Sequence, residues 1–401
     1  MKAFFYLTLA FFTFLTLSGC GDDDDNGPGF TTPETYTFIR DGQSTVSFSG
    51  QSTRIAMAEE LTAAMLDFTR DADDLNNMFR NAEGTNPFAD AALNASTKSV
   101  RSKVAASNDL FAANAVGSAL VRETFDGWIN AQVNEVFPGR NQLATDGQAG
   151  QLADGGSVRY VNARGYEYNQ FFGKSLIGAL MYDQLANNYL SPAVLDRDGN
   201  AEANDAETLV DGRNYTAMEH FWDEAYGYLF GASADPANGL ADLGTADGFL
   251  NKYLGRVETD PDFAGIAERI ETAFRRGRAA IVAGDYVARD EQGQLIKDEL
   301  AKVIAVRAVY YLQQGKAALS ATPPDYGAAF HDLSEGAGFV YSLRFTERAD
   351  GTSGNGLSAS AFASLLRADT NGFWGLTATE LDNLSADIAA AYGITVADAG
   401  N

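Results

Sequence analysis

The sequence predicts an all-α protein, a helical bundle with a short N-terminal β-hairpin. Two observations support this fold class. Apolar residues recur at helical spacing in most segments after Gln51, whereas residues 36–48 alternate in polarity and turn at Asp41 and Gly42. Long intervals separate the helical segments, and they leave open whether the helices form one bundle or two packed bundles.

Residues 1–19 have the features of a secretory signal peptide. Lys2 is the only charged residue ahead of an apolar run at 4–17, which is short for a membrane-spanning helix. The run ends in Leu-Ser-Gly at 17–19, followed by Cys20, and this sequence resembles the lipobox of bacterial lipoproteins. The resemblance implies that Cys20 becomes a lipidated N-terminus. The alternative is an ordinary export signal without lipidation.

Residues 20–34 form an acidic, glycine-rich tether with four consecutive aspartates at 22–25, a composition that cannot build a packed core. An acidic run after a lipidated cysteine resembles the surface-export signals of some Gram-negative outer-membrane lipoproteins, although a solvated spacer explains it equally well. We therefore expect a protein anchored by lipid to the outer membrane, on the periplasmic side or at the cell surface. An outer-membrane transporter or a surface protein is a candidate partner.

The charge balance excludes one class of partner. The chain carries 54 acidic and 29 basic residues, a formal net charge of −25. Binding to nucleic acid needs a positive surface, so we expect no nucleic-acid partner. Cys20 is the only cysteine, which excludes an intramolecular disulfide, and a hydrophobic core must stabilise the fold.

Each expected helix is marked by an apolar stripe, by a capping signal or by a proline at its end. A long helix is expected at 166–189, ended by Pro192, and Thr377 with Glu380 forms a capping box that opens a terminal helix. The other stripes are Leu61, Met65 and Phe68; Phe125, Trp128, Ile129, Val133 and Val136; Ile266, Ile270, Phe274 and Ile281; and Val303, Val306, Tyr310 and Leu312.

Residues 35–401 are expected to form a single helical domain, with a division into two sub-bundles left open. The intervals between the helices are rich in Gly, Asn, Asp and Ala, which favours surface loops. These expected loops lie at 138–158, 191–213, 231–248 and 349–357.

The only two histidines, His220 and His331, occur in matching fragments of the form His-x-x-x-Glu-x-x-Gly-aromatic. Residues at i and i+4 share a helix face, so each fragment presents an imidazole beside the carboxylate of Glu224 or Glu335. If the two faces meet, four ligands suit iron, zinc or manganese. Asp223 and Glu219 would be accessory carboxylates. The alternative is that each His and Glu simply hydrogen-bond to each other.

A calcium loop is a second metal candidate. Oxygen-bearing side chains follow the alternation that such a loop requires, although Ala201 stands where a glycine is needed. The candidate ligands are Asp196, Asp198, Asn200, Glu202, Asn204 and Glu207.

Other polar and aromatic residues indicate a functional site only weakly. Glu167, Gln170 and Lys174 form a polar stripe on the long helix, and we expect a solvated face there rather than a cleft lining. Tyr310 and Tyr311 belong to a large set of tyrosines and tryptophans that we expect in the core rather than against a ligand. No nucleophile elbow, zinc-protease motif or phosphate loop occurs, so no catalytic residue is assigned.

Several segments together resemble domain-of-unknown-function family 4856, a family of bacterial lipoproteins. The resemblance rests on residues 218–228, 174–179, 36–54 and 331–339, would cover most of the mature chain, and implies no activity. A more distant likeness is to imelysin-like proteins, exported helical proteins of two bundles linked to iron acquisition. Of their Gly-x-His-x-x-Glu signature, His220 carries over directly, Asp223 replaces the glutamate, and Met218 replaces the glycine.

These observations predict an outer-membrane lipoprotein that binds a metal or a metal-containing ligand in iron uptake. One alternative is a metal-dependent hydrolase, akin to imelysin peptidases, with Glu224 or Glu335 as general base. Another is a structural surface protein whose two motifs join the halves of the bundle while its loops bind a partner protein.

Overall fold

The computed structural model describes residues 29–367 and 370–401, which form a mainly helical protein with two short hairpins. The predicted all-α class is therefore confirmed. The proposed signal peptide, Cys20 and tether residues 20–28 lie outside the described residues. In the part of the chain that is described, no helix combines the length and the apolar character needed to cross a bilayer.

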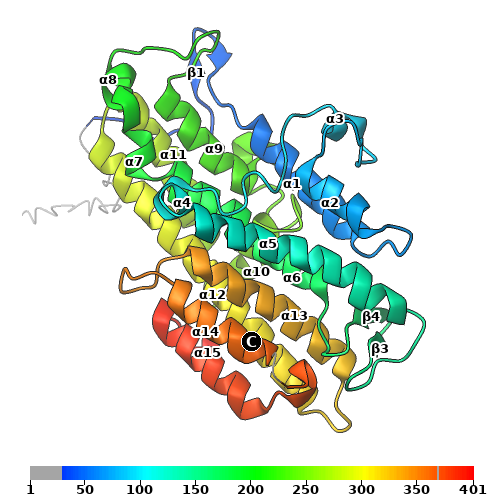
Figure 1. Cartoon of the computed structure of the whole chain (residues 1–401). Coiled ribbons are helices and arrows are strands. Elements are labelled where there is room, and N and C mark those ends of the chain that lie inside the picture. The colour runs from blue at the N-terminus through cyan, green and yellow to red at the C-terminus, as the bar shows by residue number, and fades with distance from the viewer. Residues whose placement is uncertain (1–28, 368–369) are drawn as a thin grey trace, which may run out of the picture.

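The N-terminal hairpin forms where the sequence predicts it. Strand β1 (Ile39–Arg40) pairs antiparallel with β2 (Gln43–Ser44). Asp41 and Gly42 adopt φ values of 51° and 74°, so this turn requires two residues that tolerate the left-handed region. The hairpin lies at the top of the molecule, above α9 (Ala217–Phe230) and α11 (Ile266–Ala283) (Figure 1).

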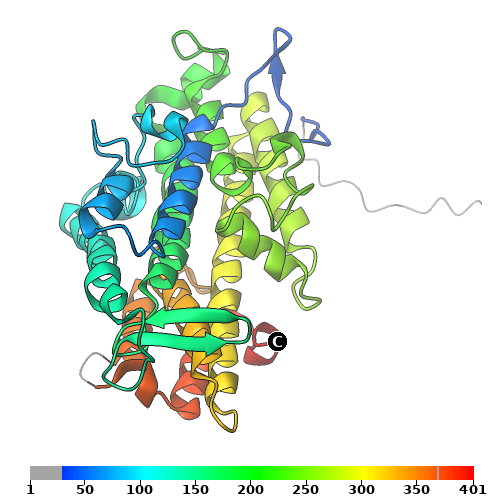
Figure 2. The ribbon, with the colours of Figure 1, turned by 90° about the vertical axis from the view of Figure 1, so that its right-hand side faces the viewer.

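All four expected loops contain or overlap regular structure: 231–248 includes the short η6 (Pro236–Asn238), and 349–357 overlaps the start of α14 (Asn355–Leu366). Residues 138–158 include β3 (Gly150–Asp154) and the start of β4 (Ser157–Val161), an antiparallel hairpin closed by a glycine turn. This hairpin lies across the lower part of the helical body (Figure 2). Residues 191–213 contain three short helices, of which the first starts at a proline and the last follows a left-handed glycine.

A long buried helical stretch runs through the centre, as the pattern at 166–189 predicts. It begins as α6 (Tyr168–Leu176) and widens into π-helical segments η3 (Ile177–Tyr182) and η4 (Leu185–Tyr189). Side chains on all its faces are buried at 168–186, apart from a half-buried glutamine. The expected solvated stripe is therefore wrong: the stretch is covered on every side, and Glu167 and Lys174 are 2% and 9% exposed.

The motif helices pack on opposite ends of this central stretch. Helix α13 (Tyr326–Ser342) lies along α6, whereas α9 lies along η4. The longest helix, α12 (Tyr286–Leu319), extends along the body and packs against α11, α13 and α15 (Figure 1). The buried apolar residues of these helices form a continuous hydrophobic core.

The remaining helices complete the body around this core. Helix α15 (Ala378–Tyr392) opens on the predicted capping box, in which Thr377 and Glu380 exchange hydrogen bonds. The others are α1 (Ser49–Ala64), α2 (Ala72–Arg80), α3 (Ala91–Asn94), α4 (Asn108–Phe111), α5 (Ala115–Ala131) with the π-helical η1 (Gln132–Val136) and the short η2 (Phe137–Gly139), α7 (Pro192–Leu195), η5 (Arg197–Gly199), α8 (Asn200–Asp205), η6 (Pro236–Asn238), α10 (Leu250–Glu258), η7 (Leu343–Phe345), α14 (Asn355–Leu366), η8 (Gly372–Gly375) and α16 (Val396–Ala399).

Candidate functional site

The first motif lies on α9, whose start is fixed by a capping box. Thr216 accepts from the backbone N–H of Glu219, and the Glu219 carboxylate accepts from the N–H of Thr216. His220 and Glu224 are one turn apart on this helix, and Nε2 of His220 lies 4.0 Å from the Glu224 carboxylate. The imidazole stacks on Tyr215, with ring centroids 4.6 Å apart. Burial lowers the pKa of His220 in spite of the nearby Glu224 charge.

Cations surround Glu224, which accepts a 2.9 Å hydrogen bond from the Gln51 amide. Nζ of Lys103 lies 3.4 Å from the Tyr189 hydroxyl, and burial, followed by the charge of Arg54, lowers the pKa of Lys103. We call these residues, with His220, the His220 cluster. It holds an imidazole and one carboxylate among positive side chains, an arrangement that disfavours a bare cation.

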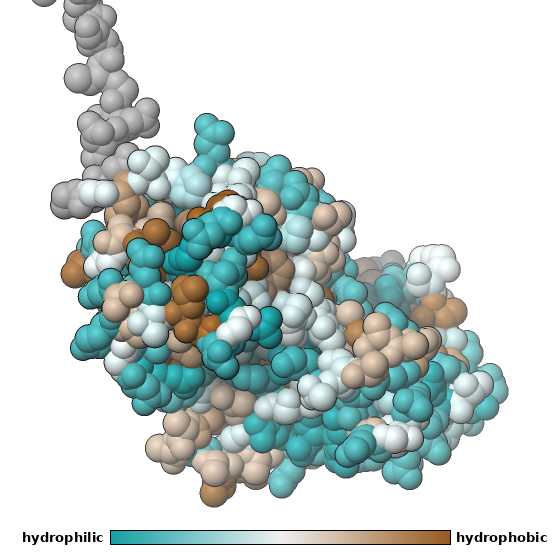
Figure 3. Space-filling model, turned by 90° about the horizontal axis from the view of Figure 1, so that it is seen from above, coloured by the Kyte–Doolittle hydropathy of each residue, from teal (hydrophilic) through white to brown (hydrophobic). Residues whose placement is uncertain are grey.

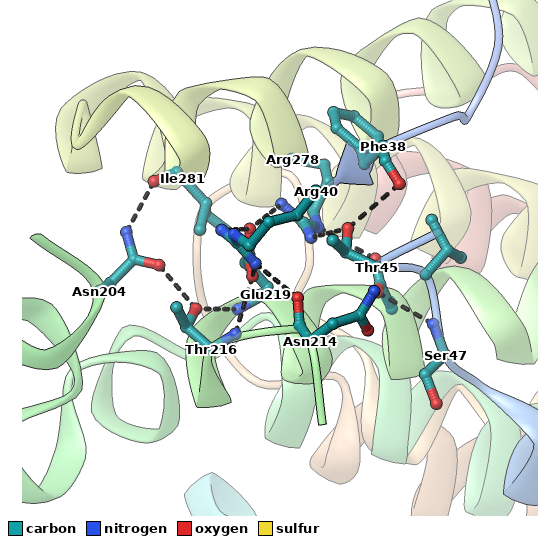
Figure 4. Close-up of polar contacts among 12 residues, drawn as sticks. Phe38, Arg40, Thr45, Ser47, Asn204, Asn214, Thr216, Glu219, Arg278 and Ile281 are labelled. Atoms are coloured by element: carbon teal, nitrogen blue, oxygen red, sulfur yellow. Dashed lines mark hydrogen bonds and ion pairs between the residues drawn. The ribbon is translucent and has the colours of Figure 1, made fainter. Parts of the chain in front are cut away.

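The accessory carboxylates, Glu219 and Asp223, form ion pairs with arginine side chains. Glu219 accepts from Arg40 and Arg278 (Figure 4). Asp223 accepts from Nε of Arg278 at 3.1 Å and from the Tyr36 hydroxyl at 2.8 Å. Burial would raise the pKa of Glu219, but the hydrogen bond from Arg40 and the charge of Arg278 outweigh it and lower that pKa. Both carboxylates therefore join the hairpin to α9 and α11 instead of lying beside His220.

The second motif lies on α13 and has a tighter geometry. Nδ1 of His331 donates to Glu167 at 2.9 Å, and its Nε2 lies 3.7 Å from Glu335. Lys174 contacts the same Glu335 oxygen at 3.3 Å, and the Tyr253 hydroxyl donates to the other oxygen at 3.3 Å. Burial opposes ionisation of Glu335, but Lys174 and His331 overcome it and hold its pKa at about 2.

Positive charge extends beyond Glu335 onto α12 and α10. The Arg307 guanidinium lies 3.9 Å from the Tyr310 ring centroid, 4.6 Å from that of Tyr311 and 5.6 Å from that of Tyr253. Nζ of Lys252, on α10, lies 5.5 Å from the Tyr253 ring centroid. We call Lys174, Lys252, Tyr253, Arg307, Tyr310, Tyr311 and Glu335 the Arg307 cluster.

Arg307 combines burial with the absence of an anionic partner among the described residues. Its side chain is 8% exposed, its Nε is buried without a hydrogen bond, and it forms no ion pair with any residue in the described ranges. Buried guanidinium groups are normally paired with a carboxylate or a bound anion. Glu335, whose charge acts on Lys252, Tyr253 and Tyr311, is already engaged by Lys174 and Tyr253.

The glycines of the two motifs have a matching role. A Cβ on Gly227 would lie 2.4 Å from Cβ of Phe48, and a Cβ on Gly338 would lie 2.4 Å from Cβ of Lys174. Each glycine therefore lets a neighbouring segment approach the helix one turn beyond the glutamate. The shared position of the glycine in the two fragments thus serves close packing in both.

The four predicted metal ligands do not converge. Helix α13 packs mainly on α6 and α9 packs mainly on η4, and the midpoints of α6 and η4 are separated by roughly 20 Å at 1.5 Å of rise per residue. Across residues 29–367 and 370–401, no group of three or more His, Cys, Asp or Glu side chains is arranged to hold a metal ion. Glu167, His331 and Glu335 are close together, but the imidazole nitrogens face the carboxylates instead of a common point.

The candidate calcium loop folds into short helices. Asn200, Glu202 and Asn204 lie within α8, where alternate side chains diverge around the helix instead of encircling an ion. Asp196 pairs with Arg289 at 2.7 Å, and the Asn204 amide donates to the Ile281 carbonyl at 2.7 Å. Asp198 and Glu207 adopt positive φ angles at the turns that flank α8.

Sequence reasoning identified Glu335 and His331 but missed what surrounds them. Glu167 and Lys174 were assigned to solvent, although their seven-residue spacing places them on one face of the central helix. Arg307, Tyr310 and Tyr311 also share a face, because they lie three and four residues apart on α12. That spacing of an arginine and two tyrosines is the signal that could have found the cluster.

The architecture defines a class of mainly helical protein with two His/Glu motifs, each set among cationic and aromatic side chains. The sequence model of one protein family, described as a domain of unknown function (DUF4856), matches residues 33–395. The chain therefore belongs to this family, as its motifs predict. No curated protein and no solved structure matches the chain, and neither comparison shows the expected likeness to imelysin-like proteins.

Proposed function

We propose that this protein is a lipid-anchored binding protein of the bacterial outer membrane that takes up an anionic ligand at the Arg307 cluster. Export and anchoring follow from the signal pattern and Cys20. The observation that carries the binding proposal is the buried guanidinium of Arg307, which has aromatic neighbours but no anion. A carboxylate or phosphate group would supply the missing partner.

The charges around this site favour an anion over a bare cation. Lys174 pairs with Glu335, and the charges of Lys174, Glu335 and Arg307 all act on Lys252, while His331 is paired with Glu167. Burial and then Lys174 lower the pKa of Lys252, so the positive charges of this cluster repel one another. A bound anion relieves that repulsion, whereas a free metal ion would have to displace Lys174 from Glu335.

A role in iron uptake is compatible with this site if the metal arrives within an anionic chelate. Carboxylate chelates of iron(III) present oxygen atoms that a guanidinium and two ammonium groups can bind. The three tyrosines offer flat apolar surfaces and hydroxyl groups beside those cations. Arginine and lysine would thus recognise the chelate while the protein itself supplies no metal ligand.

The hydrolase alternative has weaker support at this centre. It assigns the general base to Glu224 or Glu335, and a base works best when its pKa lies near the operating pH. The pKa of Glu335 is about 2, so this carboxylate accepts a proton poorly at neutral pH. We therefore propose binding rather than hydrolysis for the Arg307 cluster.

Calorimetric titration with citrate, ferric citrate and inorganic phosphate tests the proposal. We expect Arg307→Gln to weaken anion binding roughly 10- to 100-fold, because a hydrogen bond to a charged group contributes about 1.5–3 kcal/mol. Arg344→Gln is the matched control, since Arg344 also lies over a tyrosine ring, at 5.9 Å from Tyr341, and outside the cluster. Equal affinity in the wild type and both variants would contradict the proposed site.

A further inference from the structure

An apolar groove lies beside the point where the described chain begins. It has a volume of about 300 Å³ and is lined chiefly by carbon-rich side chains from the N-terminal segment and from the end of α11. Its main lining residues are Phe30, Pro33, Phe38, Ile39, Ala279 and Val282. The groove therefore joins residues that are far apart in the sequence.

The rim of this groove exposes large apolar side chains. Ile39 is 58% exposed and Val282 is 57% exposed. On the face seen from above in Figure 3, apolar residues lie among hydrophilic ones. A cluster of this kind in a chain of charge −25 marks an interaction surface more readily than an ordinary solvated face.

We propose that this groove and its rim rest on the lipid bilayer that anchors Cys20. The inference depends on the lipid anchor of the proposed function. Residues 20–28 connect Cys20 to the first described residue, and fully extended they reach at most about 30 Å. The apolar surface beside Gly29 and Phe30 is thus held close to the membrane. Such tethering gives effective concentrations in the millimolar range, at which weak apolar contacts suffice.

Electrostatics determines which lipid surface suits this face. Glu34 and Asp41 are exposed near the groove, and the tether carries four aspartates. Anionic headgroups would repel these charges as well as the net charge of the protein. The face therefore fits a zwitterionic surface, on which shallow insertion of Ile39 and Val282 buries apolar area without bringing like charges together.

Bimane labels on the full, lipidated chain in phosphatidylcholine vesicles test this contact. Val282→Cys places a label in the rim, and Leu143→Cys places one at a 76% exposed apolar residue in the loop before β3. We expect the label at 282 to emit at shorter wavelength and to be quenched by brominated lipid, and the label at 143 to do neither. Adding phosphatidylglycerol should reduce the quenching at 282.

Two results would overturn the inference: one leaves the lipid anchor of the proposed function intact, and the other rules it out. If the chain is lipidated at Cys20 by mass spectrometry and both labels remain equally unquenched, the bilayer contact is wrong while the anchor stands. If the chain carries no lipid and does not float with the vesicles, the anchor and the contact both fail. Anion binding at Arg307 is measured separately and is unaffected by either result.

Discussion

At the scale of single residues, the surroundings of Glu335 carry the functional argument. A carboxylate that is nearly inaccessible to solvent remains ionised because Lys174 and His331 lie within 4 Å of it. The sequence identified the carboxylate and the imidazole through their spacing. Helical spacing groups Arg307 with Tyr310 and Tyr311, but it could not place Lys252, Tyr253 or Arg307 near Glu335, because that placement depends on how α10 and α13 each pack against α12.

The two histidines should make opposite contributions to the pH dependence of stability. Burial lowers the pKa of His331, but the hydrogen bond to Glu167 outweighs it, and the net pKa is raised above its unfolded value of about 6.5. The contribution of His331 to the free energy of unfolding is therefore fully present below about pH 6.5, and it is lost as the pH rises through the pKa of the folded state. The loss in the free energy of unfolding caused by His331→Gln should be largest under acidic conditions.

His220 provides the control for this prediction. Burial lowers its pKa, so the folded state resists protonation, and this residue's contribution becomes unfavourable as the pH falls below about 6.5. Urea unfolding of wild type, His331→Gln and His220→Gln across this pH range measures both effects. Parallel stability curves for the two variants would contradict the assigned environments.

Another residue-level prediction concerns the buried Arg278. Its side chain is fully buried and pairs with Glu219 at 3.0 Å and Asp223 at 3.1 Å. Arg278→Ala leaves both carboxylates without this partner, and removing one member of a buried pair costs about 3–5 kcal/mol. Arg348→Ala, which removes a partly exposed pair with Asp350, should cost less than about 1 kcal/mol. Similar costs in chemical denaturation would show that the network does not hold the hairpin in place.

At the scale of secondary-structure elements, the sequence predicted those with strong local signals. Asp41 and Gly42 form the expected turn, and Thr377 with Glu380 caps the last long helix. The hairpin of β3 and β4 was missed because the glycines before and between its strands make the segment resemble a loop, although Asp154-Gly155 is a turn signal. The π-helical widening at 177–189 has no such signal, since it depends on how neighbouring helices pack.

The close crossing of the central stretch and α13 predicts that the protein is destabilised when Gly178 is replaced by a larger residue. A Cβ on Gly178 would lie 2.4 Å from Cα of Ser342, which is backbone and cannot easily move. We expect Gly178→Ala to destabilise the protein by about 1–3 kcal/mol through overpacking. Gly127→Ala on α5 has open space around it and should instead stabilise by about 0.5–1 kcal/mol through helix propensity. Melting temperatures that shift in the same direction for both variants would contradict this packing.

At the scale of the whole molecule, the sequence predicted the all-α class and the family but not the relation between the two motifs. Matching local patterns suggested that His220, Glu224, His331 and Glu335 would meet. Local periodicity places side chains on a face of a helix, but it does not say which helices become neighbours. Here α9 and α13 pack on opposite ends of one central stretch, so each motif meets its own set of cations.

Elemental analysis after gel filtration tests the central claim most directly. The wild type, Arg307→Gln and the double variant His220→Ala/His331→Ala would each be equilibrated with zinc or iron salts, or with ferric citrate. We predict that the wild type retains iron from ferric citrate, that Arg307→Gln loses it, and that the wild type retains no bare cation. Retention of a bare metal ion by the wild type and Arg307→Gln, but not by the double variant, would contradict an anion site and restore direct coordination by histidine.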